Sequence, residues 1–96
     1  MMELSEARKA VRAVDEEMAK LFARRMEAVK RIAAYKLGHG LPVEDPQREK
    51  ETAETLGALI DDAELRPYYL RFLESTVELS KSYQRSLISA SEEKRR

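Results

Sequence analysis

Hydrophobic residues recur three and four positions apart in the first third of this chain, which is the period of an α-helix with one apolar face. In the segment from residue 3 to residue 37 these positions are Leu4, Ala7, Val11, Val14, Met18, Leu21, Phe22, Val29 and Ile32. Ser5 has the residue type of a helix N-cap, and Gly38 has that of a residue following a helix. The pattern predicts one long helix.

Glycine and proline residues separate this segment from two others. The run KLGHGLPVEDP breaks the helical pattern, and Asp45 followed by Pro46 has the composition of a helix start. We expect this second helix to end near Asp61 and a third to begin at Pro67. One face of the third helix carries Tyr69, Leu73, Thr76, Ser80 and Leu87. The sequence thus predicts an all-α fold with a long, a short and a long helix.

The length of the chain bears on its assembly. With 96 residues we expect a single domain over residues 1–96, in which residues 92–96 form a frayed tail. A helix over residues 3 to 37 is about 50 Å long, whereas a compact chain of this length has a radius of gyration of about 12 Å. The first helix would therefore leave part of its apolar face in water unless a second chain covered it. We predict an intertwined helical homodimer.

The composition excludes several classes of function. The chain has 18 Lys and Arg residues against 18 Asp and Glu residues, so it lacks the basic excess typical of nucleic-acid binding. It has no Cys and one His, which excludes a thiolate nucleophile and a histidine metal cluster. No stretch approaches about 18 consecutive apolar residues, and the first residues do not resemble a secretory signal. We expect a cytoplasmic protein that does not enter the membrane.

Several cations stand where the helical pattern places core positions. Arg25 and Lys36 continue the spacing of Val29 and Ile32, and Arg8 lies on the stripe closer to the N-terminus. Burying a cation without a partner is costly, and fewer acids than cations lie on these faces. The pattern therefore indicates a pocket for a small carboxylate-bearing anion, which guanidinium groups bind well.

Further polar residues lie on the other two helices. Arg48 and Glu49 follow Asp45 in the first turn of the second helix, and Ser80 and Gln84 share one face of the third. Explanations without function exist: Asp45 caps a helix, Ser80 can bond to a carbonyl one turn earlier, and Gln84 can fix a dimer register. The combination, rather than any single residue, favours a binding site.

In this order the residues resemble the all-helical AroQ class of chorismate mutases. The run ARKAVRAVDEEMAKLFARRMEAVKRIAAYK resembles the family's first helix, with an Arg, the xIDxxxxxLxxxR pattern and a Lys eleven residues after the Arg of that pattern. LPVEDPQREKE resembles the loop and the start of the second helix, and SKSYQ supplies the Ser-x-x-x-Gln of the third. The resemblance covers about residues 4 to 90, with about one residue removed in the turn DDAELRPYY.

The resemblance implies the conversion of chorismate to prephenate in phenylalanine and tyrosine biosynthesis, an intramolecular [3,3] shift that uses no metal or cofactor. It implies that Arg25, together with Arg8 from the partner subunit, holds the two substrate carboxylates. Lys36 would bind a carboxylate and the ether oxygen, to which Gln84 would also donate. The resemblance also implies that Glu49 and the backbone at Asp45 hold the ring hydroxyl. It implies supporting contacts to the anion for Arg48 and Ser80.

Other functions stay open on this sequence. Isochorismate-pyruvate lyase and a mutase of 4-amino-4-deoxychorismate would share the fold, although Asp45 with Arg48 and Glu49 matches the mutase pattern better than that of the lyase. A non-catalytic helical dimerisation or regulatory module would also explain the apolar stripes. This alternative predicts that replacing Arg25 or Lys36 with alanine removes no catalytic activity, because there is none to lose.

Overall fold

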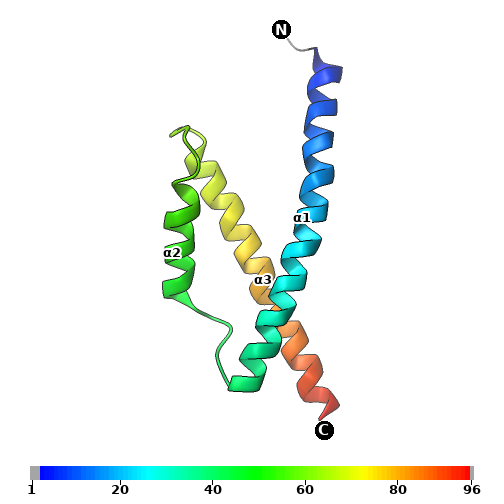
Figure 1. Cartoon of the computed structure of the whole chain (residues 1–96), viewed down its shortest axis with the longest axis vertical. Helices are drawn as coiled ribbons and strands as arrows, with labels where there is room; N and C mark the ends of the chain where they lie inside the picture. The colour runs from blue at the N-terminus through cyan, green and yellow to red at the C-terminus, as the bar shows by residue number, and fades with distance from the viewer. Residues whose placement is uncertain (1–2, 96) are drawn as a thin grey trace.

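The computed structural model describes residues 3–95, in which it has three α-helices and no strand. α1 spans Leu4–His39, α2 spans Pro46–Gly57 and α3 spans Arg66–Lys94. α3 crosses the C-terminal half of α1, and α2 lies beside the N-terminal half of α3 (Figure 1). The prediction of an all-α fold with a long, a short and a long helix is confirmed.

The helix starts differ slightly from those predicted. Ser5 is not the N-cap of α1: the extended backbone residue before the helix is Glu3, and no side chain caps this end. α3 begins one residue before Pro67, which therefore lies inside the first turn. At its other end α3 continues to Lys94, into the segment 92–96 for which a frayed tail is predicted.

The glycine that follows α1 is Gly40, the second glycine of the turn, and not Gly38 as predicted. Gly40, not Gly38, adopts the left-handed conformation, with φ of 63°. Its N–H donates to the carbonyl of Leu37 at 3.4 Å, and the N–H of Leu41 donates to the carbonyl of Lys36 at 2.9 Å. This pair of hydrogen bonds is the Schellman motif, which satisfies the last carbonyls of a helix and requires positive φ at the residue that Gly40 occupies.

The predicted start of α2 is confirmed, whereas its end is not. The Asp45 side chain caps the helix by accepting the backbone N–H three residues later at 3.2 Å. α2 ends at Gly57 instead of near Asp61. Glycine is unfavourable inside a helix, and the chain turns after Gly57, whose carbonyl accepts the backbone N–H of Ile60 at 3.2 Å. The Arg66 guanidinium, across the turn, also donates to the carbonyl of Gly57 at 3.2 Å and to that of Ile60 at 2.7 Å.

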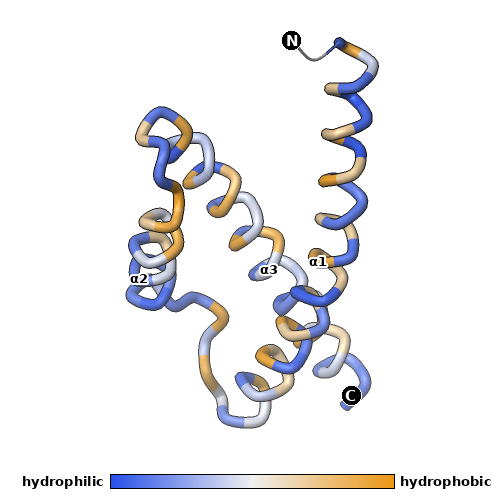
Figure 2. The backbone as a smooth tube through the Cα atoms, turned by 45° about the horizontal axis from the view of Figure 1, so that its top comes forward, coloured by the Kyte–Doolittle hydropathy of each residue, from blue (hydrophilic) through white to orange (hydrophobic). Residues whose placement is uncertain are grey.

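The chain is elongated, with extents of 61 × 27 × 14 Å and a radius of gyration of 17.2 Å. The N-terminal half of α1 projects beyond α3, and apolar residues recur along this projecting part (Figures 1 and 2). The apolar residues buried within the described chain are Val29, Ala33 and Leu73. Large apolar side chains left exposed on the projecting part are Leu4, Val11, Val14, Met18, Leu21 and Phe22. The homodimer stays a prediction, and this exposed face is its structural basis.

Candidate functional site

A cavity of about 660 Å³ lies between the C-terminal half of α1, the loop that follows it, the first turns of α2 and the middle of α3. All three helices contribute polar side chains to its wall, while Val29 and Ile32 of α1 supply apolar surface. Seven of the eight candidate residues line this one cavity. They are Arg25, Lys36, Asp45, Arg48, Glu49, Ser80 and Gln84.

The charges on the cavity wall are unevenly distributed. Five cationic side chains line it, those of Arg25, Arg31, Lys36, Arg48 and Lys81. Two acidic side chains line it, those of Asp45 and Glu49. The excess of three positive charges, obtained by subtracting two from five, occurs in a chain whose formal net charge is zero. Such a cavity favours an anion, because the surrounding protein weakens the interaction less than bulk water does.

Arg25 joins α1 to α3 at one wall of the cavity. Its Nη1 donates to the Ser80 hydroxyl oxygen and, at 3.5 Å, to the carbonyl of Thr76. Ser80 in turn donates to the Thr76 carbonyl at 2.8 Å, the back-bond one turn earlier that its sequence position allows. Ser80 thus orients the guanidinium group, whose remaining N–H groups are available to a ligand.

Lys36 fixes the loop between α1 and α2 against the cavity. Its Nζ donates to the carbonyl of Val43 at 2.9 Å, and the residue is half-buried. A lysine ammonium has three N–H donors. One of them holds the loop, which leaves two that can reach an anion in the cavity.

Gln84 has a buried amide oxygen whose hydrogen-bonding capacity is unused. The residue is 6% exposed, and its Oε1 has no hydrogen-bond partner among the described residues. An unpaired buried polar atom costs free energy. Since the amide also lines the cavity, a bound ligand is the natural partner for this side chain, which can present either its oxygen or its NH₂ group on rotation.

Both cavity acids are engaged by the protein itself. Asp45 Oδ1 accepts the backbone N–H of Arg48 at 3.2 Å, and Glu49 Oε2 lies 3.4 Å from the backbone nitrogen of Asp45. This reciprocal pairing resembles a capping box. Glu49 Oε1 also accepts a hydrogen bond from Lys81 Nζ at 2.9 Å. The first turn of α2 is therefore rigidly placed at the cavity edge.

Lys81 is a site residue that sequence reasoning missed. It is 9% exposed, and its Nζ lies 2.9 Å from Glu49, 2.9 Å from Glu78 and 3.1 Å from Glu44. The hydrogen bonds that Lys81 donates to Glu78, Glu49 and Glu44 raise the pKa of Lys81 above its ordinary value. The hydrogen bond from Lys81 lowers the pKa of Glu44, against the opposing effect of burial, with help from Arg85. Of these three partners, only Glu78 is close to Lys81 in the sequence. Two residues three positions apart on a helix form an ordinary surface ion pair, so this spacing does not indicate a site.

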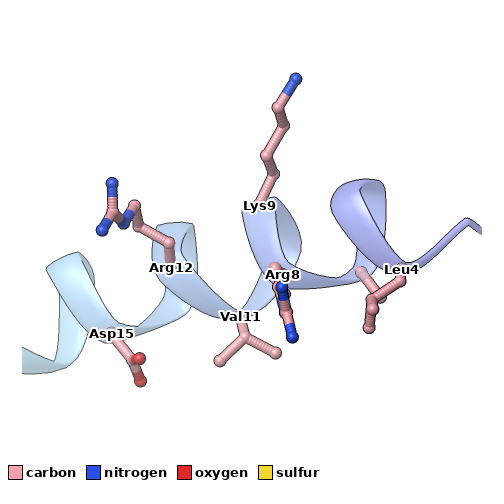
Figure 3. Close-up of a pocket in the computed structure, with 7 residues that line it drawn as sticks. Leu4, Arg8, Lys9, Val11, Arg12 and Asp15 are labelled. Carbon is pink, nitrogen blue, oxygen red and sulfur yellow. The ribbon is translucent and has the colours of Figure 1, made fainter.

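Arg8 is the candidate that the single chain does not bring to the cavity. It lines a separate hollow of about 560 Å³ on the projecting half of α1. There Arg8, Val11 and Asp15 point to one side of the helix, while Lys9 and Arg12 point to the other (Figure 3). Arg8 thus lies on the exposed apolar face, as its place on the stripe predicts. Its contribution to the site of a partner subunit stays a prediction.

The described part of the chain has neither a clustered metal site nor a membrane-spanning helix. Residues 3–95 hold no cluster of three or more His, Cys, Asp or Glu side chains arranged to bind a metal ion. None of the described helices combines the length and apolarity needed to cross a bilayer. The cytoplasmic location remains a prediction from the sequence.

Comparisons with known proteins point to one family. The family described as chorismate mutase type II matches residues 7–85. A curated relative, the bifunctional chorismate mutase/prephenate dehydratase of Aquifex aeolicus (strain VF5), is 39% identical over 56 residues, which is 58% of this chain and 16% of that protein. The match therefore spans only a small part of the relative's length. No solved structure matches the chain.

Proposed function

Because the chain belongs to the chorismate mutase type II family, we propose that it converts chorismate to prephenate, as a step in phenylalanine and tyrosine biosynthesis. The reaction is an intramolecular [3,3] rearrangement, in which the ether C–O bond breaks while a C–C bond forms. All atoms of the substrate stay in the product. The protein therefore has to supply shape and charge rather than a reacting group.

The observation that carries this proposal is the cationic cavity. Chorismate is a dianion, and the cavity offers three more positive than negative side chains together with two apolar ones on its α1 wall. In our proposal the Arg25 guanidinium binds one carboxylate as a two-pronged donor. Arg48 adds positive charge to the cavity wall, and Ser80 keeps Arg25 in place through the hydrogen bond described above.

Lys36 and Gln84 act at the bond that breaks. As the ether bond lengthens, negative charge grows on its oxygen, and donors fixed beforehand at that position stabilise the transition state more than the ground state. Lys36 has N–H groups to spare after holding the loop, and the Gln84 amide is buried with its oxygen unpaired. We assign both as donors to this oxygen, with Lys36 also contacting a carboxylate.

The remaining contacts hold the ring in its reactive chair-like shape. We assign Glu49 and the backbone of Asp45 to the ring hydroxyl, because both lie at the α2 edge of the cavity. Restraining a flexible substrate in this shape removes entropy from the barrier. This role requires a rigid wall, which the reciprocal hydrogen bonds of the α2 cap supply.

We further propose that the working unit is an intertwined homodimer in which Arg8 completes the partner's site. Six large apolar side chains are exposed on the projecting half of α1, and a second chain lying along that half would cover them. Arg8 shares that half. A cation there would give the second carboxylate of the substrate a guanidinium partner from the other chain.

The decisive experiment is an absorbance assay of chorismate loss with the purified chain, in which the product is identified by chromatography. We expect prephenate. Parallel assays with isochorismate and with 4-amino-4-deoxychorismate separate the other activities known on similar sites. Release of pyruvate from isochorismate faster than chorismate rearranges would overturn the assignment.

The contribution of Arg8 from the partner is tested by mixing two inactive variants, Arg8→Ala and Arg25→Ala. A mixed dimer has one site that carries both substitutions and one that carries neither. After random exchange of subunits in equal amounts, about a quarter of all sites are intact. We expect activity to return to about that fraction, whereas no recovery after exchange would contradict a contribution from the partner chain.

A further inference from the structure

Lys81 is a buried cation at the cavity whose hydrogen-bonding capacity is fully used. Its three N–H donors face three carboxylates, those of Glu49, Glu78 and Glu44, at 2.9 to 3.1 Å. These acids come from α2, from α3 itself and from the loop before α2. Lys81 therefore has no donor left for a ligand. If Lys81 affects a bound ligand, it does so through one of the three acids that it contacts.

Glu49 is the acid through which this effect can pass. Of the three carboxylates bound to Lys81, that of Glu49 alone lines the cavity. The other cavity acid, Asp45, is engaged as the cap of α2. Every remaining charged side chain on the wall is a cation. Because Glu49 is paired with Lys81, the cavity has no unpaired acid to offer to a positively charged group.

We propose that Lys81 is a specificity-determining positioning residue: by pairing with Glu49, it makes the α2 edge of the cavity accept a substrate ring that carries a hydroxyl group and reject one that carries an amino group there. This inference rests on the proposed function. An amino group is protonated at neutral pH, and it would enter a cavity with an excess of positive charge. Discrimination of this kind comes from a repulsive element as much as from an attractive one.

A purely structural role for Lys81 makes a different prediction. Lys81 also ties the loop to α3 through Glu44, so its loss could weaken the site by loosening that loop. Glu44 does not line the cavity. The variant Glu44→Gln weakens the loop tether by removing its negative charge and leaves the pair of Lys81 with Glu49 intact, which makes it the matched control.

The test measures kcat/KM for chorismate and for 4-amino-4-deoxychorismate in the wild type and four variants. Lys81→Met and Lys81→Gln remove the charge, and Lys81→Gln still donates hydrogen bonds in case Lys81→Met does not fold. Lys81→Arg keeps the charge. We expect both uncharged variants to shift the ratio toward the amino substrate by about tenfold or more, while Lys81→Arg and Glu44→Gln keep the wild-type ratio.

Two outcomes overturn the inference, and they differ from failure of the proposed function. An unchanged ratio in a folded Lys81→Gln or Lys81→Met variant, with folding checked by circular dichroism, refutes the electrostatic role of Lys81. An equal shift in Glu44→Gln assigns the effect to the loop instead. A wild-type chain that rearranges neither substrate overturns the proposed function, and this inference with it.

Discussion

The replacement Arg25→Ala separates catalysis from folding. A hydrogen bond to a charged group contributes about 1.5–3 kcal/mol, so a two-pronged guanidinium–carboxylate pair contributes roughly 3–6 kcal/mol. Since each 1.4 kcal/mol is about a factor of ten, kcat/KM should fall by roughly 10²- to 10⁴-fold. The fold should lose little, because Arg25 is exposed and Ser80 keeps its hydrogen bond to the Thr76 carbonyl.

The chain contains a matched control for this experiment. Arg24 is the neighbouring residue on α1, it is exposed, and it does not line the cavity. We expect Arg24→Ala to keep nearly all of the chorismate mutase activity, measured as chorismate loss by absorbance. Thermal unfolding by circular dichroism and size exclusion should show both variants folded as the wild type is. If a folded Arg25→Ala variant kept more than about a tenth of kcat/KM, the proposed role of Arg25 would be refuted. That result would favour the alternative of a non-catalytic helical module.

Three further changes test other parts of the site and fold. Gln84→Glu should retain activity mainly at acidic pH, where the carboxyl group is protonated and can donate to the ether oxygen; a pH–rate profile like that of the wild type would contradict this role. Because the pKa of Glu44 is lowered below its ordinary 4.5 by Lys81, its pairing stabilises the fold above that pH and is lost as the pH falls through the folded-state pKa. As the pH falls from neutral to well below 4.5, the melting temperature of Glu44→Gln should therefore fall less than that of the wild type. In Gly57→Ala the new Cβ would lie 3.2 Å from Leu70 Cδ2, the end of a side chain that is 37% exposed and free to yield. We expect the gain in helix propensity to raise the free energy of unfolding by about 0.5 kcal/mol, and a loss in urea titrations would show that Leu70 does not yield.

The helices could be predicted from the sequence because their signals are local. The three/four spacing of apolar residues and the cap formed by Asp45 and Pro46 act within a turn or two of the backbone, and both are found in the structure. The helix ends that were predicted wrongly are of two kinds. The end of α2 involves a residue across the turn, and the end of α1 required a choice between Gly38 and Gly40, two glycines of the same turn. α2 stops at Gly57, and the turn after it is held in part by Arg66, which is nine residues from Gly57 and donates to its carbonyl.

The site divides in the same way. Arg25 and Lys36 stand on a predicted helical face, so their convergence on one cavity follows from periodicity. Lys81 could not be recognised, because its partners Glu44 and Glu49 are 37 and 32 residues away and come close only when the loop and α2 fold back onto α3. Its spacing of three residues from Glu78 is that of an ordinary ion pair on a helix surface. A side chain whose environment is created by tertiary structure leaves no local pattern.

The packing of α2 has a consequence for local stability. α2 rests on α3 and makes no helix-to-helix contact with α1 within the described chain, so it is supported on one side only. Elements with few packing contacts open at a lower free energy than the whole molecule unfolds. Amide hydrogens of α2 should therefore exchange with solvent faster than those in the crossing of α1 and α3. Since α2 carries the cap and Glu49, this exchange would report how often one wall of the cavity opens while the crossing of α1 and α3 stays folded.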